Sequence, residues 1–310
     1  MTGRDPVVSV VIPAYGHAQF LPRTIQSVLD QTFDEPIDII VVDDGSPDDT
    51  VGAVEPFGDR VRFVRQKNGG QGSARNKGIS LAHGEFVAML DDDDLFTPDK
   101  LQWQVEAMQH DPDLVLVYGE DDRIDADDKP VSVAPRENYR RPSGDCHRDF
   151  LVGCWIATPG QTLIRRSALA AVGGYDETIW GSDDWELYIR LSEQGPFHYD
   201  PRVALHYRVH PGNHSGNILR HFVGHQQVID KHPSDDPAVR TERRESGRAY
   251  FLHNLMQVSH AARLRGDLAT SLEAQRYAAQ LDTSVRWRRE WWKPHLLNRL
   301  GIRPKQKPTV

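Results

Sequence analysis

Residues 86–94 read FVAMLDDDD, five apolar residues followed at once by four carboxylates. An uninterrupted apolar run of this length is typical of a strand that is buried on both faces of a sheet. The adjacent carboxylates at 91–94 repel one another, and a divalent cation that prefers oxygen ligands, Mg²⁺ or Mn²⁺, would remove that cost. The alternative is a solvated acidic turn that caps a helix beginning near Pro98. The position directly after a strand favours a ligand site.

Apolar runs of the same kind recur before this stretch, at residues 7–12 (VVSVVI), 37–42 (IDIIVV) and 61–64. Segments with a helical pattern separate them, at 20–29 and 73–81. Strands that alternate with helices predict an α/β fold with a mostly parallel sheet flanked by helices. In such sheets ligands bind beyond the carboxyl ends of the strands. The sequence places its unusual residues at those ends, at 13–15, 43–46 and 91–94.

The second half of the chain is less regular. We expect helices at 101–109 and 184–194 and strands at 114–118, 161–165 and 203–209. The polar, proline-bearing residues 119–150 indicate loops and hairpins. Beyond about residue 217 the pattern is helical, and the apolar stripes at 243–265 and 268–281 indicate packing.

The 310 residues carry 37 Lys and Arg against 45 Asp and Glu, a net charge of -8. This acidity argues against a general nucleic-acid-binding protein, which gains affinity by neutralising phosphates. It suits a protein that holds a cation. The charge is unevenly placed, since residues 284–310 carry a net charge of +7 and the rest of the chain therefore carries -15.

The expected compartment follows from features that the sequence lacks. Two cysteines, Cys146 and Cys154, are too few for a disulfide scaffold and match no metal-site spacing, so we expect ordinary thiols. The N-terminus has neither the basic start nor the apolar core of a signal peptide, and no run approaches ~18 apolar residues. The sequence therefore predicts a cytoplasmic protein without a membrane-spanning segment.

Two further motifs follow the predicted strands. The DDGS motif at 43–46 offers carboxylates that can accept hydrogen bonds from a base or a ribose, although a plain turn is the alternative because Asp, Gly and Ser are turn formers. The glycine-rich segment at 68–76 (NGGQGSARN) leads into a helix and can bring backbone N–H groups close to an anion. It is not a Walker loop, because no Gly-Lys-Ser/Thr follows.

Four strings in this order resemble the nucleotide-binding half of a family 2 glycosyltransferase of the GT-A fold. They are VSVVIPAYGHAQFLPRTIQSVLDQTF, IDIIVVDDGSPDDT, NGGQGSARNKGI and GEFVAMLDDDDLFTPDKL. The resemblance continues more weakly through QTLIRRSALAAVGGYDE and GSDDWELYIRLSEQG to YRVHPGNHSGN. It implies a GT-A, Rossmann-like sheet with a nucleotide-sugar-binding half at 1–110, an acceptor-binding half at 111–216 and a C-terminal helical extension at 217–310.

The resemblance also implies roles for residues on the donor side. Pro13, Ala14 and Tyr15 match the loop in which the family holds the nucleotide base. Asp44 matches the carboxylate that binds uracil in members that use uridine nucleotides. Arg75 matches a basic residue near the base and the phosphates.

The acidic run matches the family's Asp-x-Asp region. Asp91 or Asp92 would face the ribose, and Asp93 would bind the metal that bridges the diphosphate. His210 stands where some members place a histidine near the metal or the diphosphate, with a structural histidine as the alternative. His206 and His214 are weaker candidates.

The motif DDWE at 183–186 resembles the segment whose Asp is the catalytic base of inverting members. Asp184 stands at that position, and Asp183 replaces the more frequent Glu. A carboxylate within hydrogen-bond reach can remove the proton of an acceptor hydroxyl. The alternative is a helix start, where acids are favoured. Trp155, Asp183 and Trp185 are expected beside the acceptor, although a tryptophan is as often a core residue.

The sequence thus predicts a metal-dependent, inverting transfer of a sugar from a nucleotide-diphosphate donor, a UDP-sugar, to an acceptor hydroxyl of a glycan, a lipid-linked precursor or another cell-surface precursor. The expected cofactor is Mn²⁺ or Mg²⁺. A noncatalytic protein that binds sugar nucleotides or glycans on the same fold is the alternative, and it would need no base. A nucleotidyltransferase is a third class, but no glycine-rich basic loop follows the first strand.

The basic end of the chain interleaves tryptophans with cations, at Trp287, Trp291 and Trp292 among Arg286, Arg288, Arg289 and Lys293. Aromatic residues with cations suit a helix that lies on an anionic membrane surface. We expect peripheral contact with the inner face of the membrane through residues 285–303. The alternative is a helix whose basic side packs on the acidic body of the protein.

Overall fold

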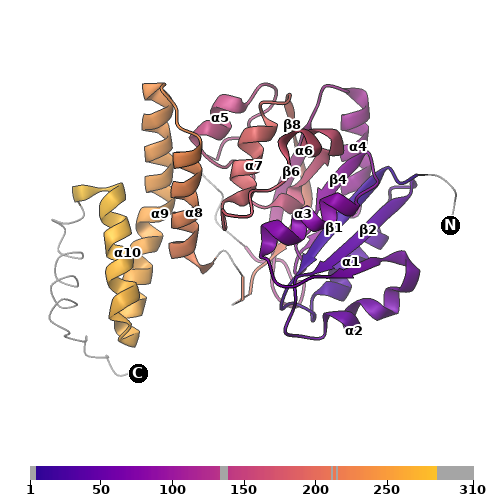
Figure 1. Cartoon of the computed structure of the whole chain (residues 1–310), viewed down its shortest axis with the longest axis horizontal. Helices are drawn as coiled ribbons and strands as arrows, with labels where there is room; N and C mark the ends of the chain where they lie inside the picture. The colour runs from indigo at the N-terminus through magenta and orange to yellow at the C-terminus, as the bar shows by residue number, and fades with distance from the viewer. Residues whose placement is uncertain (1–4, 133–138, 211, 214–215, 285–310) are drawn as a thin grey trace. The chain divides into compact units, whose positions relative to one another are not determined.

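The computed structural model of the chain describes residues 5–132, 139–210, 212–213 and 216–284 (Figure 1). The chain forms two compact units. The first consists of Met1–Phe150 and Cys154–Asn213, and the second of Leu151–Gly153 and His214–Val310. The boundary that we expect between residues 110 and 111 lies inside the first unit and stays a prediction.

The first unit is built on a sheet whose strands follow the order β3-β2-β1-β4-β7-β6-β8-β5. These strands are β1 (Val8–Ala14), β2 (Ile37–Asp43), β3 (Arg62–Arg65), β4 (Phe86–Met89), β5 (Leu95–Phe96), β6 (Leu116–Ile124), β7 (Thr162–Arg165) and β8 (Phe197–Arg208). The four strands β1 to β4 are mutually parallel, and β6 is parallel to β8. β7 runs antiparallel to β4 and β6, and β5 to β8. The expected α/β fold with a mostly parallel sheet is confirmed.

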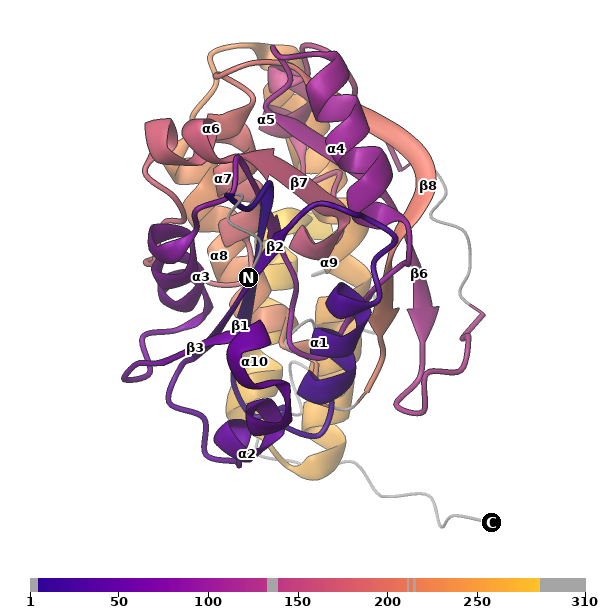
Figure 2. The ribbon, with the colours of Figure 1, turned by 90° about the vertical axis from the view of Figure 1, so that its right-hand side faces the viewer.

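Helices cover both faces of the parallel strands. On one face, Leu21 and Ile25 of α1 (Leu21–Leu29) pack in one apolar core with Val10 of β1 and with α4 (Lys100–His110). On the other face lies α3 (Gln71–Leu81), and Figure 2 shows α1 and α3 on opposite sides of β1 and β2. Gly78 permits this approach, because a Cβ atom there would lie 2.2 Å from Cγ1 of Val11. The alternation of Val10 and Val11 explains why the strand is apolar on both faces.

The remaining elements of the first unit connect these layers. They are α2 (Thr50–Val54), a 3-10 helix (Glu55–Arg60), α5 (His147–Val152, of which Leu151 and Val152 belong to the second unit), a 3-10 helix (Pro159–Gln161), α6 (Arg166–Val172) and α7 (Asp183–Leu191). The expectation of loops and hairpins at 119–150 holds just after β6, where Ile124 and Pro130 pair in antiparallel orientation, but β6 is longer than expected and a helix stands near residue 150. β6 continues to Ile124 because β8 supplies backbone partners across a register shift near Glu120, and α5 begins at His147.

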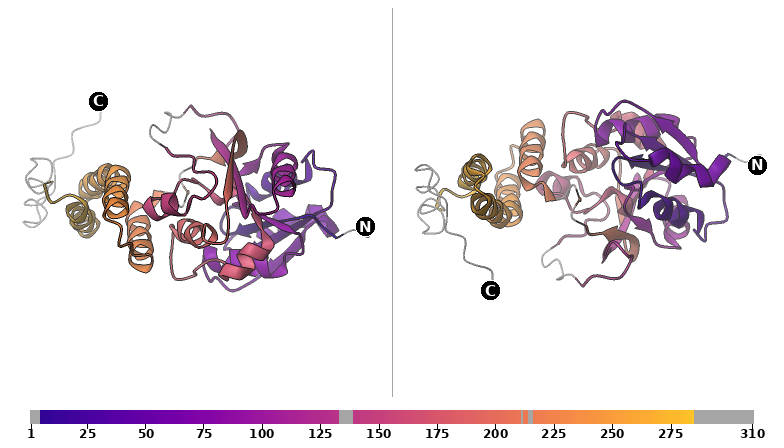
Figure 3. Two further views of the ribbon diagram at one scale, coloured as in Figure 1. Left: turned by 90° about the horizontal axis from the view of Figure 1, so that it is seen from above. Right: turned by 90° about the horizontal axis from the view of Figure 1, so that it is seen from below.

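The second unit contains α8 (Ile218–Lys231), α9 (Pro237–Arg265) and α10 (Leu268–Leu281). Figure 3 shows these helices running side by side, in orange to yellow. Phe222, Phe251 and Leu255 form their core with alanines of α10, as the apolar stripes predict. Among the described residues, no helix is long and apolar enough to cross a membrane. The segment 285–303 that we expect at the membrane lies outside the described residues.

Candidate active site

The first three motifs meet at one edge of the sheet, because β1, β2 and β4 are parallel and end side by side. The backbone N–H of Asp44 donates to the carbonyl oxygen of Ala14 at 3.0 Å, so the end of β2 is held against the end of β1. The backbone N–H of Tyr15 donates to Oδ2 of Asp92 at 2.8 Å, which joins β1 to the acidic run after β4. Pro13 and Ala14 are buried in β1, whereas Tyr15 is 43% exposed. An exposed ring therefore stands at this edge.

Asp44 holds the glycine-rich loop in place. Its carboxylate accepts hydrogen bonds from the backbone N–H groups of Gly69 and Gly70, each at 2.8 Å, and from Nε2 of Gln66 at 2.9 Å. Gly70 has a φ of 90°, in the left-handed region that glycine adopts without strain. Asp44 is only 3% exposed, and its carboxylate accepts all three of these hydrogen bonds. A side chain without two acceptor oxygens would leave buried N–H groups without partners, which explains the carboxylate at this position.

The four carboxylates of the acidic run point to different partners. Asp91 lies beside Arg75 and Asp92 beside His17, with separations of 2.9 Å. Asp93 pairs with Nε2 of His210, also at 2.9 Å. Asp94 is fully buried, where it accepts a hydrogen bond from the backbone N–H of Arg208. The four carboxylates therefore lie in different environments, which reduces the repulsion between them that the sequence implies.

One of these surroundings can hold a metal ion. Donor atoms of His17, Asp93 and His210 all lie within 4.8 Å of one another. They come from the segments after β1, β4 and β8, which meet at this edge. Asp92 hydrogen-bonds Nδ1 of His17 at 2.9 Å. Carboxylates of this kind orient the imidazoles of metal sites. Two imidazoles and one carboxylate form a donor set that fits a divalent transition metal and leaves coordination positions open.

Neighbouring carboxylates raise the pKa of His17. Burial alone would lower the pKa of His17, but the hydrogen bond and charge of Asp92, together with the charges of Asp93 and Asp91, raise it to about 9. Burial raises the pKa of Asp92 to about 6, against the opposing effect of its hydrogen bond to His17. At neutral pH without a metal, the pair therefore holds one proton on the imidazole, which a bound metal would displace.

Arg75 connects the acidic run to the DDWE motif. Its guanidinium is 1% exposed, and Nη2 lies 2.9 Å from Oδ1 of Asp91. Nη1 lies 2.9 Å from Oδ2 of Asp183 and 3.0 Å from Oδ1 of Asp184. The guanidinium also lies over the ring of Tyr175, with its carbon 5.1 Å from the ring centroid. One cation thus binds three carboxylates from two distant parts of the sequence.

Asp184 differs from its neighbour in exposure. It lies in the first turn of α7, where its side chain is 24% exposed, whereas that of Asp183 is 3% exposed. Burial raises the pKa of Asp184 to about 7, and the charges of Asp183 and Asp91 add to this effect while Arg75 opposes it. Asp184 is therefore a carboxylate that reaches solvent and exchanges its proton near neutral pH, as a general base requires.

The sequence profile of glycosyl transferase family 2 matches residues 9–173, more than half of the chain. The chain belongs to glycosyl transferase family 2. It is 32% identical to a chondroitin synthase of Escherichia coli over 215 residues and 31% identical to an uncharacterized glycosyltransferase of Rickettsia felis over 225 residues. These matches cover 68% and 70% of this chain but 30% and 36% of those proteins. The chain thus spans about a third of the length of these relatives.

Solved structures agree with the GT-A fold that the resemblance to family 2 implies. Staphylococcus aureus TarS, residues 1–349 with UDP-GlcNAc, superposes with a TM-score of 0.63 at 14% identity and covers 90% of this chain and 91% of its own. The mannosyltransferase PcManGT of Pyrobaculum calidifontis, in complex with GDP-Man and Mn²⁺, gives a TM-score of 0.60 at 20% identity and covers 96% of this chain and 86% of its own. At these identities the likeness shows the fold.

Two of the residues expected beside the acceptor of a family 2 enzyme are buried. Trp185 is 2% exposed and donates from Nε1 to the carbonyl oxygen of Phe150 at 2.7 Å. Trp155 is 9% exposed and donates to the carbonyl oxygen of Asp149 at 2.8 Å. Both tryptophans are therefore anchored in the interior by hydrogen bonds to the backbone, and their place beside the acceptor stays a prediction.

The sequence reasoning missed His17 and Arg208. His17 follows the end of β1 by three residues, so its position after a strand end was the signal that could have found it. Arg208 is fully buried, and its Nε donates to the carbonyl oxygen of Asp93 at 2.6 Å. Of the weaker candidates, His206 pairs with Asp122 at 2.5 Å, and His214 lies outside the described residues.

Proposed function

We propose that this family 2 member is a metal-dependent, inverting glycosyltransferase. It moves a sugar from a nucleotide-diphosphate donor, a UDP-sugar, to an acceptor hydroxyl of a glycan, a lipid-linked precursor or another cell-surface precursor. The observation that carries the proposal is the bridge that Arg75 makes between Asp91, at the donor edge of the sheet, and Asp184. A solvent-reaching carboxylate beside the donor edge has the position and the pKa of a general base. A protein that only binds sugar nucleotides would need no such group.

The donor would lie along the carboxyl ends of the strands. Tyr15, with Pro13 and Ala14 behind it, would contact the base, and Asp44 would bind uracil directly or through the loop that it holds. Asp91 or Asp92 would bind the ribose. The UDP-GlcNAc complex of the structurally similar TarS supports a uridine nucleotide as the donor.

His17, Asp93 and His210 would hold the divalent cation, since their donor atoms converge in one place. A bound cation would neutralise the negative charge that develops on the leaving diphosphate. We propose Mn²⁺ rather than Mg²⁺, because Mg²⁺ prefers a shell made only of oxygen atoms. The Mn²⁺ complex of PcManGT supports this choice.

Asp184 would act on the acceptor. Its carboxylate takes the proton of the acceptor hydroxyl while that oxygen attacks the anomeric carbon from the side opposite the leaving nucleoside diphosphate. One displacement of this kind inverts the configuration and needs no covalent intermediate. Arg75 keeps Asp184 in place and limits the rise of its pKa. Asp183, which shares Nη1 of Arg75, would fix the start of α7.

We further propose that the enzyme works in the cytoplasm at the inner face of the membrane. Support comes from the composition of residues 285–303, where tryptophans and cations alternate. Separation of soluble and membrane fractions after expression of the full chain would test this location, and recovery only in a fraction outside the cytoplasm would contradict it.

A thermal-shift screen of nucleotide-sugars with and without Mn²⁺ tests the proposed function. We expect one UDP-sugar to raise the melting temperature only when Mn²⁺ is present, because a cation held by His17, Asp93 and His210 would offset the charge of the diphosphate. Release of UDP on addition of acceptors then identifies a transferase, whereas release of pyrophosphate would identify a nucleotidyltransferase. A donor-dependent shift that is the same without any metal would contradict the proposed role of the cation.

A further inference from the structure

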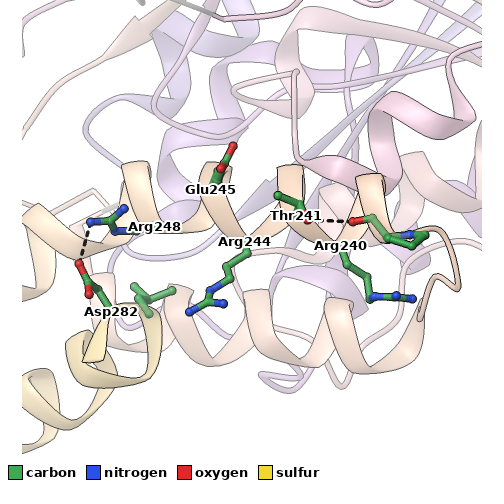
Figure 4. Close-up of a pocket in the computed structure, with 8 residues that line it drawn as sticks. Arg240, Thr241, Arg244, Glu245, Arg248 and Asp282 are labelled. Carbon is green, nitrogen blue, oxygen red and sulfur yellow. Dashed lines mark hydrogen bonds and ion pairs between the residues drawn. The ribbon is translucent and has the colours of Figure 1, made fainter. Parts of the chain in front are cut away.

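The second unit carries a row of arginines that the proposed transfer does not use. Arg240, Arg244 and Arg248 are exposed on α9 at intervals of four residues, so they share one side of the helix. At about 1.5 Å per residue the row spans about 12 Å. Figure 4 shows Arg240 and Arg244 extending to one side of α9 and Glu245, which also lines the hollow beside the row, extending to the other.

The three arginines line a surface cavity. A cavity of about 500 Å³ is lined by the three arginines together with two acids, Glu245 and Asp282, and with Pro237, Thr241 and Leu281. Arg240 and Arg244 also line a second, adjoining hollow of about 520 Å³. Cavities of this size are typical of ligand sites. The walls combine guanidinium groups with apolar carbon, as a site for an amphiphilic ligand requires.

The protein only partly neutralises this row. Arg248 pairs with Asp282 at 2.7 Å, and Arg240 donates to the carbonyl oxygen of Ser234 at 2.9 Å. Arg244 has neither a hydrogen bond nor an ion pair with the part of the chain that the structure describes. Like charges four residues apart destabilise a helix. An anion from outside would offset that cost and fill the free donors of Arg244.

The sequence that follows indicates the source of the anion. Asp282 lines the hollow, and three residues later begins the segment 285–303, with six Lys and Arg, one Glu and three Trp. In the sequence, Arg286 follows Asp282 by four residues. The arginine row and the basic aromatic segment therefore both belong to the second unit, and both are rich in cations. Tryptophan beside cations is typical of contact with anionic lipid surfaces and not of contact with free phosphate.

We propose that Arg240, Arg244 and Arg248 form a binding site for the phosphate groups of an anionic lipid surface. The site orients the chain on the membrane in addition to any contact made by 285–303. The proposed lipid site does not depend on the proposed sugar transfer, because none of the three arginines lies in the unit that carries Asp93 and Asp184.

Flotation of the full chain with lipid vesicles tests the proposal. We expect binding to phosphatidylcholine vesicles that contain about 30% phosphatidylglycerol at about 0.1 M NaCl, and little binding to phosphatidylcholine alone. Changing the three arginines together to Gln should weaken binding about 100-fold, since each basic residue near such a surface contributes about fivefold. The Lys231→Gln, Arg265→Gln, Arg276→Gln variant is the matched control, because it removes the same charge from exposed positions outside the row. We expect the control to lose less than about fivefold.

Three results would overturn the proposal. The Gln variant of the row could bind like the wild type, or the control could lose as much as that variant, which would show an effect of net charge alone. Inorganic phosphate could release the protein from vesicles at an ionic strength where chloride does not, which would indicate a site for free phosphate. A variant with the three arginines changed to Lys controls for misfolding of the Gln variant. This Lys variant should keep most of the vesicle binding, because the positive charges are kept. The metal-dependent donor shift should be unchanged in every variant, so failure here is distinguishable from failure of the proposed transfer.

Discussion

Replacing Arg75 with Lys should move the pH dependence of the transfer without abolishing it. The wild-type kcat/KM should fall about tenfold per pH unit below about 7, because Asp184, with its pKa raised to about 7, must be deprotonated to act as a base. Arg75 reaches Asp91 with Nη2 and both Asp183 and Asp184 with Nη1. A lysine has one nitrogen and cannot span these positions.

The size of the effect follows from the bond that is lost. A charge-assisted hydrogen bond contributes about 1.5–3 kcal/mol. Because one pKa unit corresponds to about 1.4 kcal/mol, loss of this bond should raise the pKa of Asp184 by about 1–2 units, to about 8–9. At pH 7 the deprotonated fraction, and with it kcat/KM, should then fall about 5- to 50-fold. Near pH 9 the variant should recover to within about tenfold of the wild type, since the base is then largely ionised.

The assay is release of UDP over a pH series, with the donor and acceptor found by screening. The control is Arg62→Lys, since Arg62 pairs with Asp38 at the opposite end of β2 and should leave the profile unchanged. An Arg75→Lys profile with the same acid limb as the wild type would refute the link between Arg75 and the base. A loss that does not recover at high pH would refute it as well, because Arg75 would then act on the donor.

Three further predictions concern the metal and the fold. Asp93→Ala should abolish the Mn²⁺-dependent thermal shift with a UDP-sugar, and a shift of native size would contradict Asp93 as a ligand. His17→Gln should weaken Mn²⁺ binding about 10- to 100-fold in an electron paramagnetic resonance titration, with the 69%-exposed His83→Gln as the control; equal affinities would show that His17 is not a ligand. Gly78→Ala should lower the free energy of unfolding by about 1–3 kcal/mol in urea, because its Cβ would lie 2.2 Å from Val11, and a stabilised variant would show that α3 can move away from β1.

The fold was predictable where the apolar pattern is continuous. The runs before Pro13, Asp43 and Asp91 can only be buried strands, and their parallel pairing follows from the helices between them. β6 was predicted short because its polar second half looks like a loop. Its backbone stays extended since β8, about 80 residues later in the chain, pairs with it, and such partners leave no local signal.

The candidate site was predictable residue by residue, but not as a set of contacts. The resemblance names Arg75, Asp91 and Asp184 separately, and it gives Arg75 a place near the base and the phosphates. Only the fold shows that Arg75 is buried between the two acids, since Arg75 and Asp184 are separated by 109 positions in the sequence. His17 escaped notice for the same reason, because its relation to His210 exists only where the segments after β1 and β8 meet.

Asp184→Asn separates donor binding from transfer, and it tests the central claim most directly. The measurement compares UDP-sugar binding in the presence of Mn²⁺ with the rate of transfer, in the same preparation of the variant. The account predicts donor affinity equal to that of the wild type and a transfer rate lower by at least about 100-fold, since an amide cannot take the acceptor proton. Turnover of Asp184→Asn at the native rate would contradict the account.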